Sequence, residues 1–94
     1  MRRRCEAGGK KFQINSGHAY DRAHKGGDVR DSGLSRDQIE NAIVHDLLTQ
    51  QDLSTIPRVP RYVDKVVEVE GYAVGYRVNT LPNGTVNIGT YFPG

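Results

Sequence analysis

The chain has 94 residues, of which 36% are hydrophobic and 26% are charged, so we expect one globular domain rather than a disordered segment. No apolar run approaches the ~20 residues that a membrane-spanning helix needs, and the basic start lacks the apolar core of a signal peptide. The net charge of +2 indicates a mild preference for anionic partners, not a histone-like field.

Cys5 is the single cysteine, which excludes a disulfide within the chain. Secreted domains of this size often depend on such bonds, so the sequence favours a reducing working compartment. We also expect no membrane partner, and a monomer.

The first eleven residues are expected to form a flexible basic arm, because Gly8-Gly9 and the lack of periodicity argue against a helix. The ordered domain is predicted over residues 12–94. Its first element is a short helix over roughly residues 17–25, which Asn15 or Ser16 would cap and Gly26-Gly27 would end.

A second, longer helix is predicted from Ser35 to about Gln50 or Gln51. Ser35 and Gln38 have the spacing of a capping box, in which each side chain bonds the other residue's backbone amide. The residues that follow repeat at intervals of three and four, with one polar member, Asp46: Ile39, Ala42, Ile43, Asp46 and Leu47.

After Pro60 the period changes to two, which predicts three strands. Gly71 marks a tight turn between the first two strands, and Asn83-Gly84 marks a hairpin loop between the last two. The alternating positions are Val63, Val67 and Val69; Tyr72, Val74, Tyr76 and Val78; and Val86, Ile88, Thr90 and Phe92. The expected fold class is therefore α+β, with N-terminal helices packed on a twisted antiparallel sheet.

Among the three histidines, His45 is predicted to be an exposed helix residue, whereas His18 and His24 lie in a motif-like segment. The spacings of zinc sites and of the serine-hydrolase elbow are missing, so we expect neither a metal nor any other cofactor. A histidine with basic and hydroxyl groups suits RNA cleavage, because the 2′-hydroxyl is an internal nucleophile and histidine transfers protons near neutral pH.

Two short motifs resemble a known family. Gly17-His18-Ala19-Tyr20-Asp21-Arg22 is similar to the segment that opens C-terminal toxin domains of contact-dependent inhibition and other polymorphic toxin systems. Asn83–Pro93, with its Gly89-Thr90-Tyr91-Phe92 step, resembles their closing strand. Such domains have the barnase–EndoU–colicin–RelE fold, and the resemblance covers roughly residues 15–94.

The resemblance implies a metal-independent endoribonuclease that acts on transfer RNA and leaves a 2′,3′-cyclic phosphate. It places the catalytic histidine at His18 and the phosphate-binding hydroxyl at Thr90, with Arg22 at a position that is often basic. One residue separates Arg22 from His24, whereas in the family the second histidine follows directly. Lys25 and Arg77 would add phosphate contacts, His24 would contact RNA, and Tyr91 or Tyr76 would stack on a base or complete the acid–base pair.

The resemblance also implies a larger secreted effector that delivers the domain into the target-cell cytoplasm, a cognate immunity protein and, in some systems, a host activating factor. The alternative hypothesis is a non-catalytic RNA- or protein-binding module on the same scaffold, such as an inhibitor or a phage-structure accessory domain. A DNA nuclease is less favoured, because DNA lacks the 2′-hydroxyl and the sequence has no cluster of carboxylates for two metals.

Overall fold

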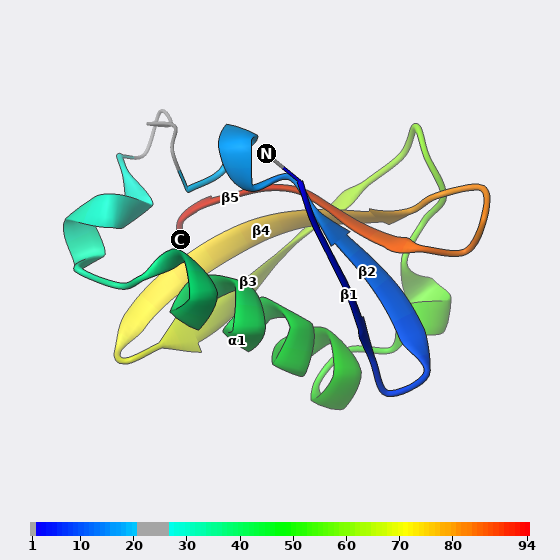
Figure 1. The fold of residues 1–94 in the computed structure, drawn as a ribbon, viewed down its shortest axis with the longest axis horizontal. Coiled ribbons are helices and arrows are strands. Elements are labelled where there is room, and N and C mark those ends of the chain that lie inside the picture. Colours follow the sequence, from blue (N-terminus) through cyan, green and yellow to red (C-terminus); the bar gives the residue numbers. More distant parts are fainter. Residues whose placement is uncertain (1, 21–26) are drawn as a thin grey trace.

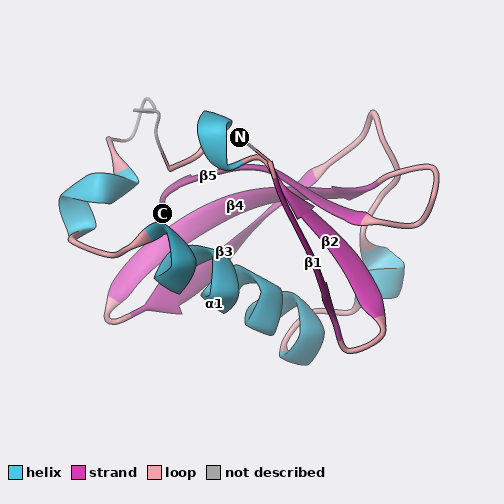
Figure 2. Cartoon of the chain, viewed as in Figure 1, coloured by secondary structure: helices cyan, strands magenta, loops and turns pink. Residues whose placement is uncertain are grey.

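The computed structural model describes residues 2–20 and 27–94, apart from the side chain of His18. One long helix lies across one face of a five-stranded sheet, which gives the α+β class that the sequence predicts (Figures 1 and 2). In chain order the elements are β1 (Arg3–Ala7), β2 (Lys10–Ile14), η1 (Ser16–His18), η2 (Val29–Ser32), α1 (Arg36–Thr49), η3 (Leu53–Thr55), β3 (Val63–Val69), β4 (Tyr72–Thr80) and β5 (Val86–Pro93).

The three C-terminal strands form the predicted antiparallel meander. Gly71 and Gly84 adopt φ values of 81° and 88°, a region that favours glycine, at the two turns where the sequence placed them. The period-two pattern therefore located these strands correctly.

The expectation of a flexible N-terminal arm was wrong. Residues 3–14 form the β1–β2 hairpin, which turns at Gly8 and Gly9, where φ is 56° and 77°. β2 then pairs in parallel with β5, so the sheet is mixed and its strand order is β1-β2-β5-β4-β3. Two adjacent glycines that argue against a helix are equally suited to the turn of a hairpin.

Helix α1 begins as predicted. The Ser35 side chain accepts a hydrogen bond from the Gln38 amide, and the Gln38 side chain accepts one from the Ser35 amide. Its buried face contacts the sheet, and the core contains aliphatic and aromatic side chains from both layers: Phe12, Ile14, Ile39, Ile43, Leu47, Val74, Tyr76, Val78, Val86, Ile88 and Tyr91. His45 is exposed on this helix, as expected.

The predicted helix over residues 17–25 is replaced, in its described part, by the three-residue 3₁₀ helix η1. Residues 21–25 of that prediction lie outside the described residues. Within the described chain, α1 is the single α-helix, so the expected set of N-terminal α-helices reduces to α1 with short 3₁₀ turns before it. No helix in this part of the chain is both long enough and apolar enough to cross a membrane.

Candidate active site

The sheet has an open face on the side opposite α1, and two predicted site residues meet there. Arg77 on β4 and Thr90 on β5 are direct cross-strand partners. Directly opposed side chains in an antiparallel pair have Cβ atoms roughly 4.5–5.5 Å apart. The Arg77 guanidinium and the Thr90 hydroxyl are therefore close enough to contact the same ligand.

A β-bulge puts Thr90 on this face. Arg77 pairs with Thr90 and Val78 pairs with Ile88, so Gly89 is an extra residue on β5. The extra residue reverses the alternation of the strand. Val86 and Ile88 face the core before the bulge, and Tyr91 instead of Thr90 faces the core after it.

Tyr91 therefore does not reach a bound RNA, and its predicted roles in stacking or proton transfer are wrong. Its side chain is fully buried, and its hydroxyl donates a hydrogen bond of 2.8 Å to Glu40. Unbroken alternation from Val86 and Ile88 would place Tyr91 on the open face, and the bulge at Gly89 turns it into the core instead.

Tyr76 is the cross-strand partner of Tyr91 and is also fully buried, so its predicted RNA contact is wrong as well. Its hydroxyl donates a hydrogen bond of 2.6 Å to Asp46, the one polar residue in the predicted apolar stripe of α1. Burial and this hydrogen bond raise the pKa of Tyr76 above the usual value of 10.0. Both tyrosines serve the contact between the sheet and α1.

Arg77 is held in place by two neighbours on the open face. Its Nε donates to Asp64 on β3 at 3.0 Å, and its guanidinium carbon lies 4.0 Å from the centre of the Tyr62 ring. The hydrogen bond to Asp64 raises the pKa of Arg77 above its usual value, so the side chain stays charged. The side chain is 40% exposed, which leaves it accessible to an anion.

The 3₁₀ helix η1, which ends at His18, lies beside the same stretch of β5 (Figure 1). The parallel ladder between β2 and β5 ends at the pair Ile14–Ile88, and the next amide, that of Asn15, donates to the carbonyl of Ile88 at 3.0 Å. The chain therefore enters η1 next to the bulge at Gly89. The backbone of His18 follows two residues after Ser16, whose side chain is anchored in the core.

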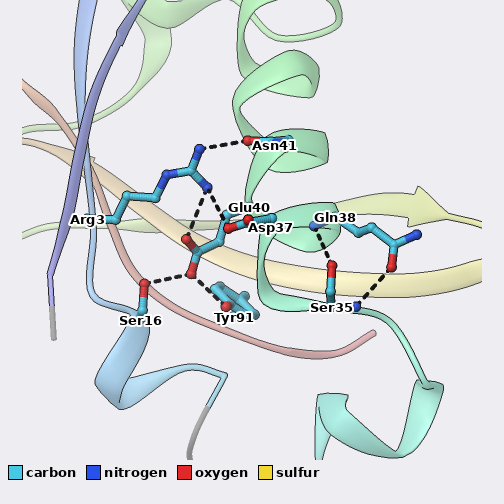
Figure 3. A network of polar contacts seen from close by, with 8 residues as sticks. All are labelled: Arg3, Ser16, Ser35, Asp37, Gln38, Glu40, Asn41 and Tyr91. Carbon is cyan, nitrogen blue, oxygen red and sulfur yellow. Dashed lines mark hydrogen bonds and ion pairs between the residues drawn. The ribbon is translucent and has the colours of Figure 1, made fainter.

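A buried carboxylate anchors η1 to the sheet and to α1 (Figure 3). Glu40 on α1 is fully buried, and its Oε2 accepts hydrogen bonds from the Ser16 hydroxyl at 2.6 Å and the Tyr91 hydroxyl at 2.8 Å. Its Oε1 accepts one from Arg3 on β1 at 3.3 Å. A buried charge is tolerated only when it is paired and hydrogen-bonded, so this cluster ties four separate elements to one point.

The remaining predicted site residues, Arg22, His24 and Lys25, lie outside the described residues. Among the described residues, no group of three or more His, Cys, Asp and Glu side chains is placed to hold a metal ion.

Sequence reasoning missed a row of amide side chains next to the Arg77–Thr90 pair. The Gln13 side chain donates to Asn87 at 3.2 Å, and the Asn87 side chain donates to Asn79 at 3.0 Å, across three neighbouring strands. The polar positions of these strands carried the signal. They could be aligned into a row only once the strand order was known.

The aromatic side chain of Phe92 also lies on the open face. A Cβ atom at Gly75 would lie 2.4 Å from the Phe92 ring, so the ring packs directly over this glycine. Phe92 shares the face of Thr90, as the alternation of the last strand predicts.

Comparison of the chain with protein-family models, curated proteins and solved structures found no match.

Proposed function

We propose that the protein is an endoribonuclease of the bacterial toxin type, with its active site on the open face of the sheet beside η1. The observation that carries the proposal is the Arg77–Thr90 pair next to the element that contains His18. A permanent cation and a hydroxyl on adjacent strands suit the two non-bridging oxygens of a phosphodiester. The resemblance of both motifs to polymorphic toxin domains supports the same assignment.

In the proposed reaction His18 accepts the proton of the 2′-hydroxyl, whose oxygen attacks the adjacent phosphorus. Arg77 and Thr90 donate to the phosphorane-like oxygens, where negative charge accumulates. The bond from phosphorus to the 5′-oxygen then breaks, and the products are a 2′,3′-cyclic phosphate and a 5′-hydroxyl. The leaving oxygen needs a proton. Tyr91 and Tyr76 both lie in the core, so we propose His24, which the sequence suggested only as an RNA contact, as the donor of this proton.

Further parts of the proposal rest on the resemblance alone. They are the barnase–EndoU–colicin–RelE fold, a transfer-RNA substrate, delivery into a target cell, inactivation by an immunity protein, and phosphate contacts from Arg22 and Lys25. We propose that no metal is required, since the 2′-hydroxyl replaces an external nucleophile.

One observation favours the alternative of a non-catalytic binding module. Arg77 is already paired with Asp64, which partly compensates its charge. An arginine in such a pair can still bind a phosphate with its remaining donors, but it stabilises developing charge less than an unpaired one.

The deciding experiment is incubation of the purified protein with total bacterial RNA in excess EDTA, next to the His18→Ala variant, with the cleaved ends mapped. We expect discrete cuts with cyclic phosphate ends from the wild type and at least ~100-fold slower cleavage from the variant. Equal cleavage by both proteins would exclude His18 from the site. If the wild type and the variant both leave the RNA intact, and do so again when the experiment is repeated in cell extract, the binding module is favoured.

A further inference from the structure

A hollow of about 540 Å³ lies between the β1–β2 hairpin and the loop that joins β4 to β5. The described chain surrounds it with polar and charged side chains from both elements: Arg4, Glu6, Lys11, Gln13, Asn83 and Thr85. Its volume is in the range of small-ligand sites, and none of its charged residues takes part in the proposed cleavage chemistry.

Strand pairing holds the two cations in place. In the backbone register of the hairpin, Arg4 lies opposite Gln13 and Lys11 lies opposite Glu6. Strand alternation puts all four side chains on the open face. Within residues 2–20 and 27–94, neither Arg4 nor Lys11 forms an ion pair, whereas Arg3 and Arg77 do. A basic segment that the sequence suggested to be a flexible arm thus presents two cations without ion pairs from a strand-paired hairpin.

Neutral donors complete the hollow. The Oδ1 atom of Asn83 accepts a hydrogen bond from the Thr85 amide at 3.0 Å, so its side-chain NH₂ group is left for a ligand. Gln13 uses one donor on Asn87 and retains a second. With Glu6 counted, the three charged residues sum to +1, which complements the single negative charge of one phosphodiester.

The hollow lies on the same face of the sheet as the proposed cleavage site. Thr85, which directly precedes β5, and Thr90 on β5 are five positions apart, or roughly 17 Å of extended chain. The amide row of Gln13, Asn87 and Asn79 lies between them. One RNA strand could therefore run across the row from Thr90 to the hollow.

We infer that this hollow binds a backbone phosphate of the RNA strand that flanks the cut, with Arg4 and Lys11 as its cationic contacts. The inference rests on the proposed function for the identity of the ligand. The site itself is a phosphodiester subsite built by the hairpin and the β4–β5 loop, separate from the Arg77–Thr90 pair.

Binding without cleavage tests the inference. A fluorescently labelled 2′-O-methyl RNA 12-mer of mixed sequence has no nucleophilic hydroxyl, and anisotropy measures its affinity for the full chain. We expect the variant Arg4→Gln/Lys11→Gln to bind about tenfold more weakly. The slope of log K against log salt concentration should fall by about 0.7, since the contact with one phosphate is removed.

The matched control is Lys10→Gln/Arg58→Gln, which removes the same charge from exposed positions outside the hollow and should keep near wild-type affinity. Glu6→Gln provides a second test with the opposite sign, because loss of the carboxylate should tighten binding about threefold. Thermal melts verify that each variant is folded.

Equal losses in the hollow variant and the control, or no loss in either, would overturn the subsite. These outcomes do not depend on cleavage. If the wild type leaves RNA intact but the hollow variant alone binds weakly, the ribonuclease proposal fails and the phosphodiester subsite stands.

Discussion

The hydroxyl of Tyr91 on β5 donates a hydrogen bond of 2.8 Å to the buried carboxylate of Glu40 on α1. Tyr91 directly follows Thr90, and the same carboxylate oxygen binds Ser16, two residues before His18. The elements that carry the two proposed site residues are therefore joined through one buried acid. Glu40 touches no substrate in this arrangement, and we assign it a positioning role.

Glu40→Gln should lower the free energy of unfolding by about 2–3 kcal/mol, because the amide cannot accept from all three donors and leaves a buried polar group unsatisfied. Urea denaturation followed by circular dichroism measures the change. Asp37→Asn is the matched control, since its side chain is 84% exposed and lies 3.9 Å from the same arginine. A loss from Glu40→Gln no larger than that from Asp37→Asn would refute the anchoring role.

Thr90→Val should slow RNA cleavage about 100-fold, the typical effect of removing one donor to a developing oxyanion. Valine keeps the β-branched shape, so we expect stability to change by less than about 1 kcal/mol. Thr90→Ser restores the hydroxyl and should recover most of the rate. Single-turnover cleavage by the three proteins provides the measurement, and a slow serine variant would show that shape rather than the hydroxyl matters.

Asp64→Asn should bind RNA several-fold more tightly than the wild type, because it leaves the charge of Arg77 uncompensated, whereas Arg77→Gln should bind about tenfold more weakly. Anisotropy with the uncleavable oligonucleotide compares them. Asp31→Asn makes the same charge change at another exposed acid and controls for net charge. If both asparagine variants tighten binding equally, the effect is global and Arg77 is not a specific contact.

Gly75→Ala should destabilise the fold by about 1–3 kcal/mol, because the new methyl group would overlap the Phe92 ring at 2.4 Å. Gly89→Ala is the control, as the nearest atom to its Cβ lies 4.0 Å away. In a Phe92→Ala background the cost of Gly75→Ala should largely vanish. Equal costs in both backgrounds would show that the ring does not rest on this glycine.

The sequence predicted the parts of the fold that depend on local rules. The capping box of Ser35 and Gln38 located the start of α1, and Gly71 and Gly84 located the two turns of the meander. The parallel contact of β2 with β5 joins residues about seventy positions apart, and no local pattern records it. The N-terminal hairpin was therefore mistaken for an arm.

The site was predictable only in part for a similar reason. Arg77 and Thr90 were both selected, but their pairing depends on a register that the extra residue Gly89 determines. The same bulge turned Tyr91 into the core, against simple alternation. Tyr76 was misassigned because an aromatic residue on a strand suits a core and a stacking surface equally well. Glu40 was missed because a carboxylate in a helix is usually solvated, and its three partners come from distant elements.

The pH dependence of stability should identify Tyr76 as a buried neutral phenol. Its pKa in the folded protein is raised above 10.0 by burial and by the bond to Asp46, so the fold favours the protonated form. The stabilisation is complete below pH 10.0 and is lost as the pH rises further, because the unfolded chain then releases a proton that the folded chain retains. The slope from this group is about 1.4 kcal/mol per pH unit.

Urea denaturation between about pH 9 and about pH 11 should therefore show a larger decline for the wild type than for Tyr76→Phe, by about 1.4 kcal/mol in total over this range. Tyr62→Phe is the matched control, since Tyr62 is 50% exposed, and it should decline like the wild type. Tyr76→Phe also removes a donor from Asp46, so its stability near neutral pH should be lower, and the comparison rests on slopes. Parallel slopes for all three proteins would mean that Tyr76 ionises as freely in the fold as in the unfolded chain.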